Sequence, residues 1–158
     1  MDQFDPWSAG FWLRVGIAVL SGGVIGVERQ MRGKPVGVRT SILICLGTSI
    51  FVELGGLSDS EHADPTRVLG QVVTGVGFLG AGVIISRGGV VTGVTTAAVI
   101  WILAAIGACI GLGFYAGAIA FALITVSLLT GVGLLEAGFE RLRTGVYSEE
   151  DNSDLDPK

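Results

Sequence analysis

Charged residues are scarce in this chain of 158 residues, and side chains that commonly carry catalysis are scarcer still. Asp, Glu, Lys and Arg make up 15% of it, against about a quarter in typical soluble domains, while half of the residues are apolar. There is one histidine and there are two cysteines. The sequence contains no HExxH motif, no serine with a usable base and no deep carboxylate pair, which argues against hydrolytic or redox chemistry. We therefore expect a membrane protein that is not an enzyme and has no cofactor or resident metal.

A basic segment ahead of the first apolar stretch is also missing. Residues 1–6 contain two aspartates and no lysine or arginine, which argues against a cleavable signal peptide.

Five segments approach the roughly 20 apolar residues that a helix needs to cross a hydrocarbon core about 30 Å thick. They are Trp7–Val27, Thr40–Gly56, Pro65–Ser86, Thr95–Gly113 and Phe114–Leu135. The sequence predicts an all-α polytopic bundle of about five spans, with a tight turn or a single bent pair at the last two.

Positive charges gather on one side of this predicted bundle. With five spans, eight of the ten lysines and arginines share a side, and such residues are retained in the cytoplasm. We therefore expect an N-out, C-in topology in a cell's inner membrane, with a transmembrane domain over residues 1–143. Residues 144–158 form an acidic, apolar-poor tail that is predicted to be disordered. The eight basic residues are Arg29, Arg32, Lys34, Arg39, Arg87, Arg141, Arg143 and Lys158.

Glycines suited to close helix packing recur in the spans. Lipid gives helices no hydrophobic reason to associate, so bundles depend on small residues that let backbones approach. Residues 75–80 also match GxGxxG, but a dinucleotide site needs a preceding strand and a later acid, and neither is present. A helix crossing or kink is the favoured interpretation, and a broken helix that opens carbonyls to an ion is the alternative. The packing glycines are Gly22, Gly26, Gly75, Gly77, Gly80 and Gly82, with Gly107 and Gly111 as a second GxxxG pair.

The most distinctive polar segment is Glu28–Arg39, between the first two predicted spans. On one interpretation, its basic residues only fix the orientation and touch anionic headgroups. The glutamate at a span end, two glycines and a proline instead favour a structured site. In that site Glu28 pairs with Arg29, Arg32 or Arg39, and the remaining donors contact a partner or lipid.

Four polar side chains lie within the spans or near their ends. Gln71 and Thr74 in the third span are predicted to hydrogen-bond to a neighbouring helix. Arg14 and Glu53 both lie near the outer boundary, where each can reach the headgroups. An ion pair between these two side chains is the alternative.

The loop before the third span contains the histidine. His62 with Asp59, Glu61 and Asp64 could hold a divalent cation, but a short solvated loop is the favoured interpretation. Asp64, directly before Pro65, is already explained as a helix N-cap. The two thiols, Cys45 and Cys109, differ in depth by roughly 14 Å at 1.5 Å per residue, which excludes a disulfide.

Several segments together resemble the MgtC/SapB family of membrane proteins, over about residues 16–113. The resemblance implies a bacterial inner-membrane protein linked to growth in low magnesium and, in pathogens, to survival inside macrophages. Family members look like regulators, and the best-known is associated with restraint of the F-type ATP synthase. This chain looks more like a short form without the C-terminal cytoplasmic domain. The segments are Gly26–Gln30, Arg32–Pro35, Gly37–Thr40, Asp64–Val68, Gln71–Gly82, Thr95–Ala98 and Trp101.

The resemblance carries over to individual positions. We expect the loop with Arg39 to contact a partner or lipid, Asp64 and Arg67 to order the outer end of the third span, and its glycines to pack against a helix or protomer. The expected partners are the bilayer, the ATP synthase or a small regulatory membrane peptide, and a second copy, but not nucleic acid. A cation or proton transporter is the alternative function. The family-matched polar residues are Glu28, Arg29, Lys34, Arg39, Asp64, Arg67, Gln71, Thr95, Thr96 and Trp101.

Overall fold

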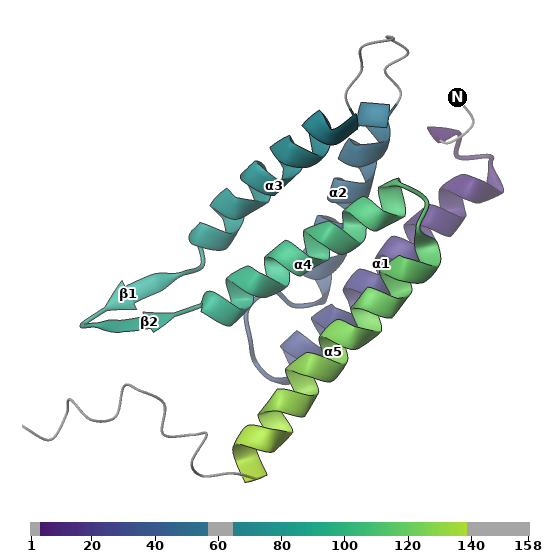
Figure 1. Cartoon of the computed structure of the whole chain (residues 1–158). Helices are drawn as coiled ribbons and strands as arrows, with labels where there is room; N and C mark the ends of the chain where they lie inside the picture. Colours follow the sequence, from purple (N-terminus) through teal and green to yellow (C-terminus); the bar gives the residue numbers. More distant parts are fainter. Residues whose placement is uncertain (1–3, 57–64, 139–158) are drawn as a thin grey trace, which may run out of the picture.

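The computed structural model describes residues 4–56 and 65–138 as a helical bundle with one short β-hairpin (Figure 1). Four of the described helices are long and apolar enough to cross a membrane, while the apolar part of α3, Arg67–Ala81, is shorter. The prediction of an all-α membrane bundle is confirmed. The elements are α1 (Ala9–Met31), α2 (Val38–Gly56), α3 (Pro65–Ala81), β1 (Ile85–Arg87), β2 (Val90–Thr92), α4 (Val94–Gly111) and α5 (Tyr115–Gly138).

Three sequence predictions fall outside the described residues. These concern the loop that contains His62, the cap at Asp64 and the tail 144–158.

The first two helices agree with the predicted spans, but α1 continues four residues past Val27 to Met31. Glu28 and Arg29 consequently belong to the last part of a helix rather than to a loop.

The third predicted span is wrong at its C-terminal end. A helix was expected through Ser86, but α3 ends at Ala81 and the chain then forms the antiparallel hairpin β1–β2, with Ile85 opposite Thr92. The turn consists of Gly88 and Gly89, whose φ angles are 55° and 84°. Two-residue hairpin turns favour positive φ at both positions, which glycine adopts without steric cost. The hairpin contains isoleucine and valine, which are as hydrophobic as the residues at the end of a transmembrane helix. Hydropathy alone therefore does not distinguish a strand from a helix in this segment.

Helix α2 packs against both α1 and α4, and glycines on those neighbours make the contacts close. A Cβ atom on Gly22 of α1 would lie 2.7 Å from the carbonyl oxygen of Ser41. A Cβ on Gly107 of α4 would lie 2.5 Å from the carbonyl oxygen of Cys45, and one on Gly111 would lie 2.6 Å from that of Ser49. No side chain fits at these positions, so the backbones themselves are in contact. Around them Ile25, Leu103, Ile106 and Ile110 are fully buried.

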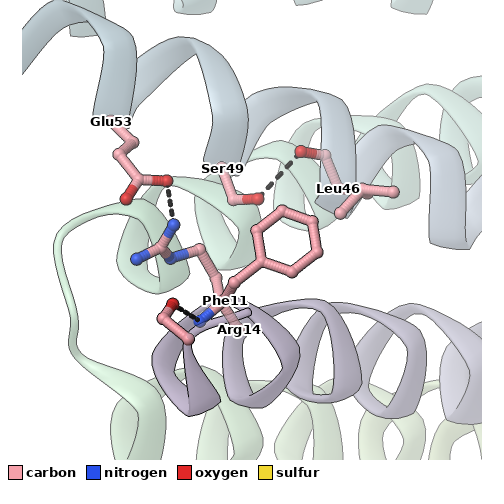
Figure 2. A network of polar contacts seen from close by, with 6 residues as sticks. Phe11, Arg14, Leu46, Ser49 and Glu53 are labelled. Carbon is pink, nitrogen blue, oxygen red and sulfur yellow. Dashed lines mark hydrogen bonds and ion pairs between the residues drawn. The ribbon is translucent and has the colours of Figure 1, made fainter. Parts of the chain in front are cut away.

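A buried ion pair joins α1 to α2 near the end of the bundle where the N-terminus lies (Figure 1). Arg14 Nη1 donates to Glu53 Oε2, and Figure 2 shows the pair beside Ser49, whose hydroxyl donates to the Leu46 carbonyl at 2.8 Å. The ion pair was only the alternative interpretation of the sequence; both side chains are buried against each other instead of extending separately to the surface. Charges are costly to bury unless they are paired, so the contact compensates both charges while holding the two helices together. Both cysteines are free thiols, as predicted.

Replacing Gly111 by leucine is expected to destabilise the bundle strongly, because the new side chain would overlap the backbone of α2. Overpacking of this kind costs about 1–3 kcal/mol or more. The matched control is Gly16→Leu, since a Cβ on Gly16 meets no atom within 4 Å and the residue is exposed. The measurement is the temperature at which the detergent-solubilised protein loses its monodisperse chromatographic peak. Equal temperatures for the two variants would contradict the close α2–α4 contact.

Candidate functional site

The α1–α2 loop, residues 32–37, folds back onto the ends of three helices. Its backbone is tied to α1, because the amide of Lys34 donates to the Arg29 carbonyl at 2.9 Å and that of Gly33 to the Gln30 carbonyl at 3.1 Å. On the other side, the Ser41 hydroxyl of α2 donates to the Val36 carbonyl at 3.3 Å. The loop therefore has a defined conformation instead of serving only as a charged connection.

Arg29 connects this loop to α4. The residue is only 4% exposed, and its Nη2 donates to the hydroxyl of Thr96 at 2.8 Å while its Nε donates to the Pro35 carbonyl at 3.4 Å. Arg29 and Thr96 are 67 residues apart in the chain. Because guanidinium carries several donors in a fixed plane, a single side chain can hold α1, the loop and the start of α4 together.

Glu28 forms its ion pair with Arg32, one of the three partners considered from the sequence. Glu28 Oε1 lies 2.7 Å from Arg32 Nε, an i,i+4 contact at the end of α1. Glu28 is 8% exposed, whereas the side chain of Arg32 is 38% exposed. The carboxylate is thus neutralised locally, and part of the arginine remains accessible.

Val36 adopts a conformation that the sequence did not suggest. Its φ is +62°, in the left-handed region that β-branched residues rarely occupy. Such strain costs of the order of 1–3 kcal/mol and persists where the surroundings determine the conformation. Val36 packs against both hydrophobic clusters of the bundle. Packing and the hydrogen bond from Ser41 therefore hold a strained loop at this end.

The four residues selected from the segment Glu28–Arg39 divide into two groups. Glu28 and Arg29 are buried and organise the loop, while Lys34 and Arg39 are exposed and are available for contact. Arg87 at the hairpin is exposed at the same end of the bundle, because α1 and α3 end there and α2 and α4 begin there (Figure 1). We define the exposed Arg32, Lys34, Arg39 and Arg87 as the basic end.

The other selected residues lie elsewhere. Thr74 does not bridge helices as predicted, since its hydroxyl donates to the Gly70 carbonyl of the same helix at 2.9 Å. Gln71, Arg67, Thr95 and Trp101 are exposed.

The selected glycines also differ from one another. Gly22 and Gly26 lie against α2, and Gly80 lies against Ala97 of α4. A Cβ atom added to Gly75 or Gly77 would meet no atom of the described residues within 4 Å, and Gly82 follows the end of α3. The GxGxxG match lies inside a continuous helix, which excludes the strand and turn of a dinucleotide site.

A groove of about 780 Å³ lies between α2 and α3, and sequence reasoning missed it. Eight of its fourteen lining residues are apolar, three are glycines, and only Thr40, Thr48 and Gln71 carry polar side chains. We call it the α2–α3 groove. Because α2 is apolar around most of its circumference, the sequence carries no signal that distinguishes the groove face from a face that contacts lipid. The apolar residues include Leu43, Phe51, Leu54, Val68, Val72 and Leu79.

Within the described ranges, no group of three or more His, Cys, Asp or Glu side chains could hold a metal ion. The two carboxylates buried in helices there, Glu28 and Glu53, are both in ion pairs with arginines. The charges of these two carboxylates are therefore compensated within the bundle.

Comparisons with known proteins agree with this architecture. A sequence model of the MgtC family matches residues 15–137. A protein of Escherichia coli K12 named "Putative magnesium transporter YhiD" is 48% identical over 115 residues, which cover 68% of this chain and 54% of that protein. Protein SapB of Bacillus subtilis is 39% identical over 143 residues, 83% of this chain and 61% of SapB. Protein MgtC of Brucella abortus is 39% identical over 135 residues, 82% of this chain and 55% of that MgtC.

No solved structure matches this chain. The chain spans about half the length of the curated relatives it matches. The family match covers most of the chain, and its helices are those of a multi-pass membrane protein. The chain therefore belongs to the MgtC family.

Proposed function

We propose that this chain is a regulatory protein of the bacterial inner membrane, linked to adaptation to low magnesium and, in pathogens, to survival inside macrophages. It acts by contact with another membrane protein, for which the F-type ATP synthase is the proposed target, and it is not an enzyme. Membership of the MgtC family supports the link to magnesium. The role of regulator and the target are inferences that the experiments below test.

The pairing of both buried carboxylates with arginines carries this proposal. A pathway for a cation through a bundle needs polar or anionic side chains that face a continuous passage. Here the carboxylates of Glu28 and Glu53 are neutralised at opposite ends of the bundle, and the helices between them are joined by glycine contacts. This arrangement favours a compact body with surfaces for contact over a conduit.

The basic end is the proposed contact surface. Lys34 and Arg39 are exposed on a loop and helix start that Arg29 and Val36 hold in place. A rigid support lets exposed side chains meet a partner without a large cost of ordering them. Gly77 on α3, where an added Cβ atom would meet none of the described atoms within 4 Å, is a proposed second contact point for a small membrane peptide or another protomer.

A cation transporter is the second candidate, because the relative at 48% identity is named for magnesium transport. Gln71 in the α2–α3 groove is the polar side chain that such a pathway would use.

The proposed orientation is five spans with the N-terminus outside, and it is tested by thiol labelling. In a chain with Cys45→Ala and Cys109→Ala, cysteine is introduced either at Lys34 or at Leu112, which is exposed in the α4–α5 turn. A membrane-impermeant maleimide is expected to label Leu112→Cys in spheroplasts and to label Lys34→Cys only in inverted vesicles. Labelling of both positions from one side would contradict five spans, since α3 would then not cross the membrane.

ATP-driven proton pumping tests the proposed target. In inverted bacterial vesicles with matched ATP synthase content, the protein is expected to lower pumping, and Arg39→Ala is expected to restore it. The matched control is Arg67→Ala, which removes the same charge from an exposed position at the other end of the bundle and should leave the inhibition in place. Membrane content of each variant is measured in parallel, because loss of insertion would assign Arg39 to topology only. Unchanged pumping with the native chain would remove the ATP synthase as a direct target.

Liposomes containing the purified protein test transport. We expect Mg²⁺ and proton fluxes equal to those of protein-free liposomes, because no charged passage crosses the described bundle. A flux that is abolished by Gln71→Leu and retained by Thr74→Val would overturn the regulatory proposal. Thr74 is a suitable control because its hydroxyl is bonded within its own helix.

A further inference from the structure

The α2–α3 groove has a closed end and an open end. A Cβ atom on Gly55 would collide with the side chain of Val68, so α2 and α3 are in direct contact at the end near the ion pair of Arg14. From there the two helices diverge, and the groove extends to Thr40 on α2 and Leu79 on α3 (Figure 1). Along α2 this is about 21 Å, at 1.5 Å per residue between Thr40 and Leu54. The groove is therefore a slot that closes toward one membrane surface.

The walls of the groove suit a hydrocarbon chain. Leu43, Phe51 and Leu79 are more than half exposed along its sides, and its floor is formed where Ile44 and Val76 pack against α4. The volume of about 780 Å³ falls within the range of roughly 300–1,000 Å³ of small-molecule sites. An apolar slot that opens sideways from a membrane helix bundle faces lipid tails, which are as apolar as its walls.

The open end of the groove lies at the basic end. Arg39 directly precedes the lining residue Thr40 and is exposed, and Lys34 and Arg87 are exposed at the same end. Glu28, in the last part of α1, is buried and paired with Arg32. The opening is therefore positively charged, which is the complement of a lipid phosphate with a net negative headgroup.

We propose that the α2–α3 groove binds one acyl chain of an anionic phospholipid, with the phosphate at Arg39. A lipid tail ends inside its own leaflet, about 15 Å deep, or half of a hydrocarbon core about 30 Å thick, so the closed end does not obstruct it. A transmembrane helix of a partner must continue through the full core, and the contact between Gly55 and Val68 stands in its path. Shape and charge thus favour a lipid over a helix. The site goes beyond the proposed regulation and does not depend on it.

The test uses the purified full chain and phosphatidylglycerol that carries a photoreactive diazirine in its acyl chain. After irradiation, mass spectrometry of peptides is expected to place the cross-links on α2 and α3. Gly47→Leu and Gly75→Leu should each remove most of this labelling, because both glycines line the groove and have open space where a side chain would begin. Gly16→Leu, in equally open space on α1, should keep it. Two filling variants on different helices guard against one that fails to fold, which chromatography reports.

The headgroup is tested with phosphatidylcholine that carries the same tail. We expect phosphatidylglycerol to label more strongly, and Arg39→Gln to reduce its labelling about fivefold, as for one basic residue near an anionic headgroup. Arg67→Gln, at the closed end, should leave labelling unchanged. Cross-links spread over α1 and α5, or equal labelling by both lipids, would overturn the proposal. So would a protein helix cross-linked in the groove in place of lipid. None of these readouts involves the ATP synthase, so a negative pumping result leaves the lipid site testable.

Discussion

The close approach of α2 to α1 and α4 is the contact on which the rest of this structure depends. Helices in a bilayer gain no hydrophobic free energy by leaving lipid for each other, so backbone contact must supply the stability. Glycines at positions 22, 26, 107 and 111 face the backbone of α2 where any side chain would collide. Because α2 packs between α1 and α4, this packing brings the ends of the three helices close together at both ends of the bundle. The contact of Arg14 with Glu53 at one end and that of Arg29 with Thr96 at the other are consequences of this packing.

At one end the packing places Arg14 beside Glu53, and at the other it places Arg29 beside Thr96 and the α1–α2 loop. Buried charges are retained there because each has a partner within reach. The same packing separates residues that look alike in the sequence. Arg29 becomes part of the support, whereas Lys34 and Arg39, a few positions further along, stay on the surface. The charges of Glu28 and Glu53 are neutralised, and the basic end is held in place by the contacts of Arg29. Such a surface suits recognition of a charged neighbour, which is the basis of the proposed regulation.

Helix α3 is the exception to the close packing, and the groove results from it. It contacts α4 and meets α2 closely at Gly55, so the remaining length of α2 and α3 encloses open space. The chain belongs to the MgtC family, and one of its relatives is named for magnesium transport. The matched region covers about half of the length of these relatives. The described bundle has two surfaces of different chemistry, the charged basic end and the apolar α2–α3 groove, which meet at Arg39.

The sequence by itself determined that this is a membrane bundle, because the thickness of the hydrocarbon core requires apolar segments of about 20 residues. It also determined where most helices lie, and the shared depth of Arg14 and Glu53 suggested their ion pair. It did not reveal that α3 ends at Ala81, since strand and helix residues are equally hydrophobic there. Only the tertiary structure decided that Arg29 bonds to Thr96, 67 residues away, and that one apolar face of α2 lines a groove. The physical reason is that hydropathy measures preference for an apolar environment, and lipid, a helix neighbour and a groove provide that environment equally well.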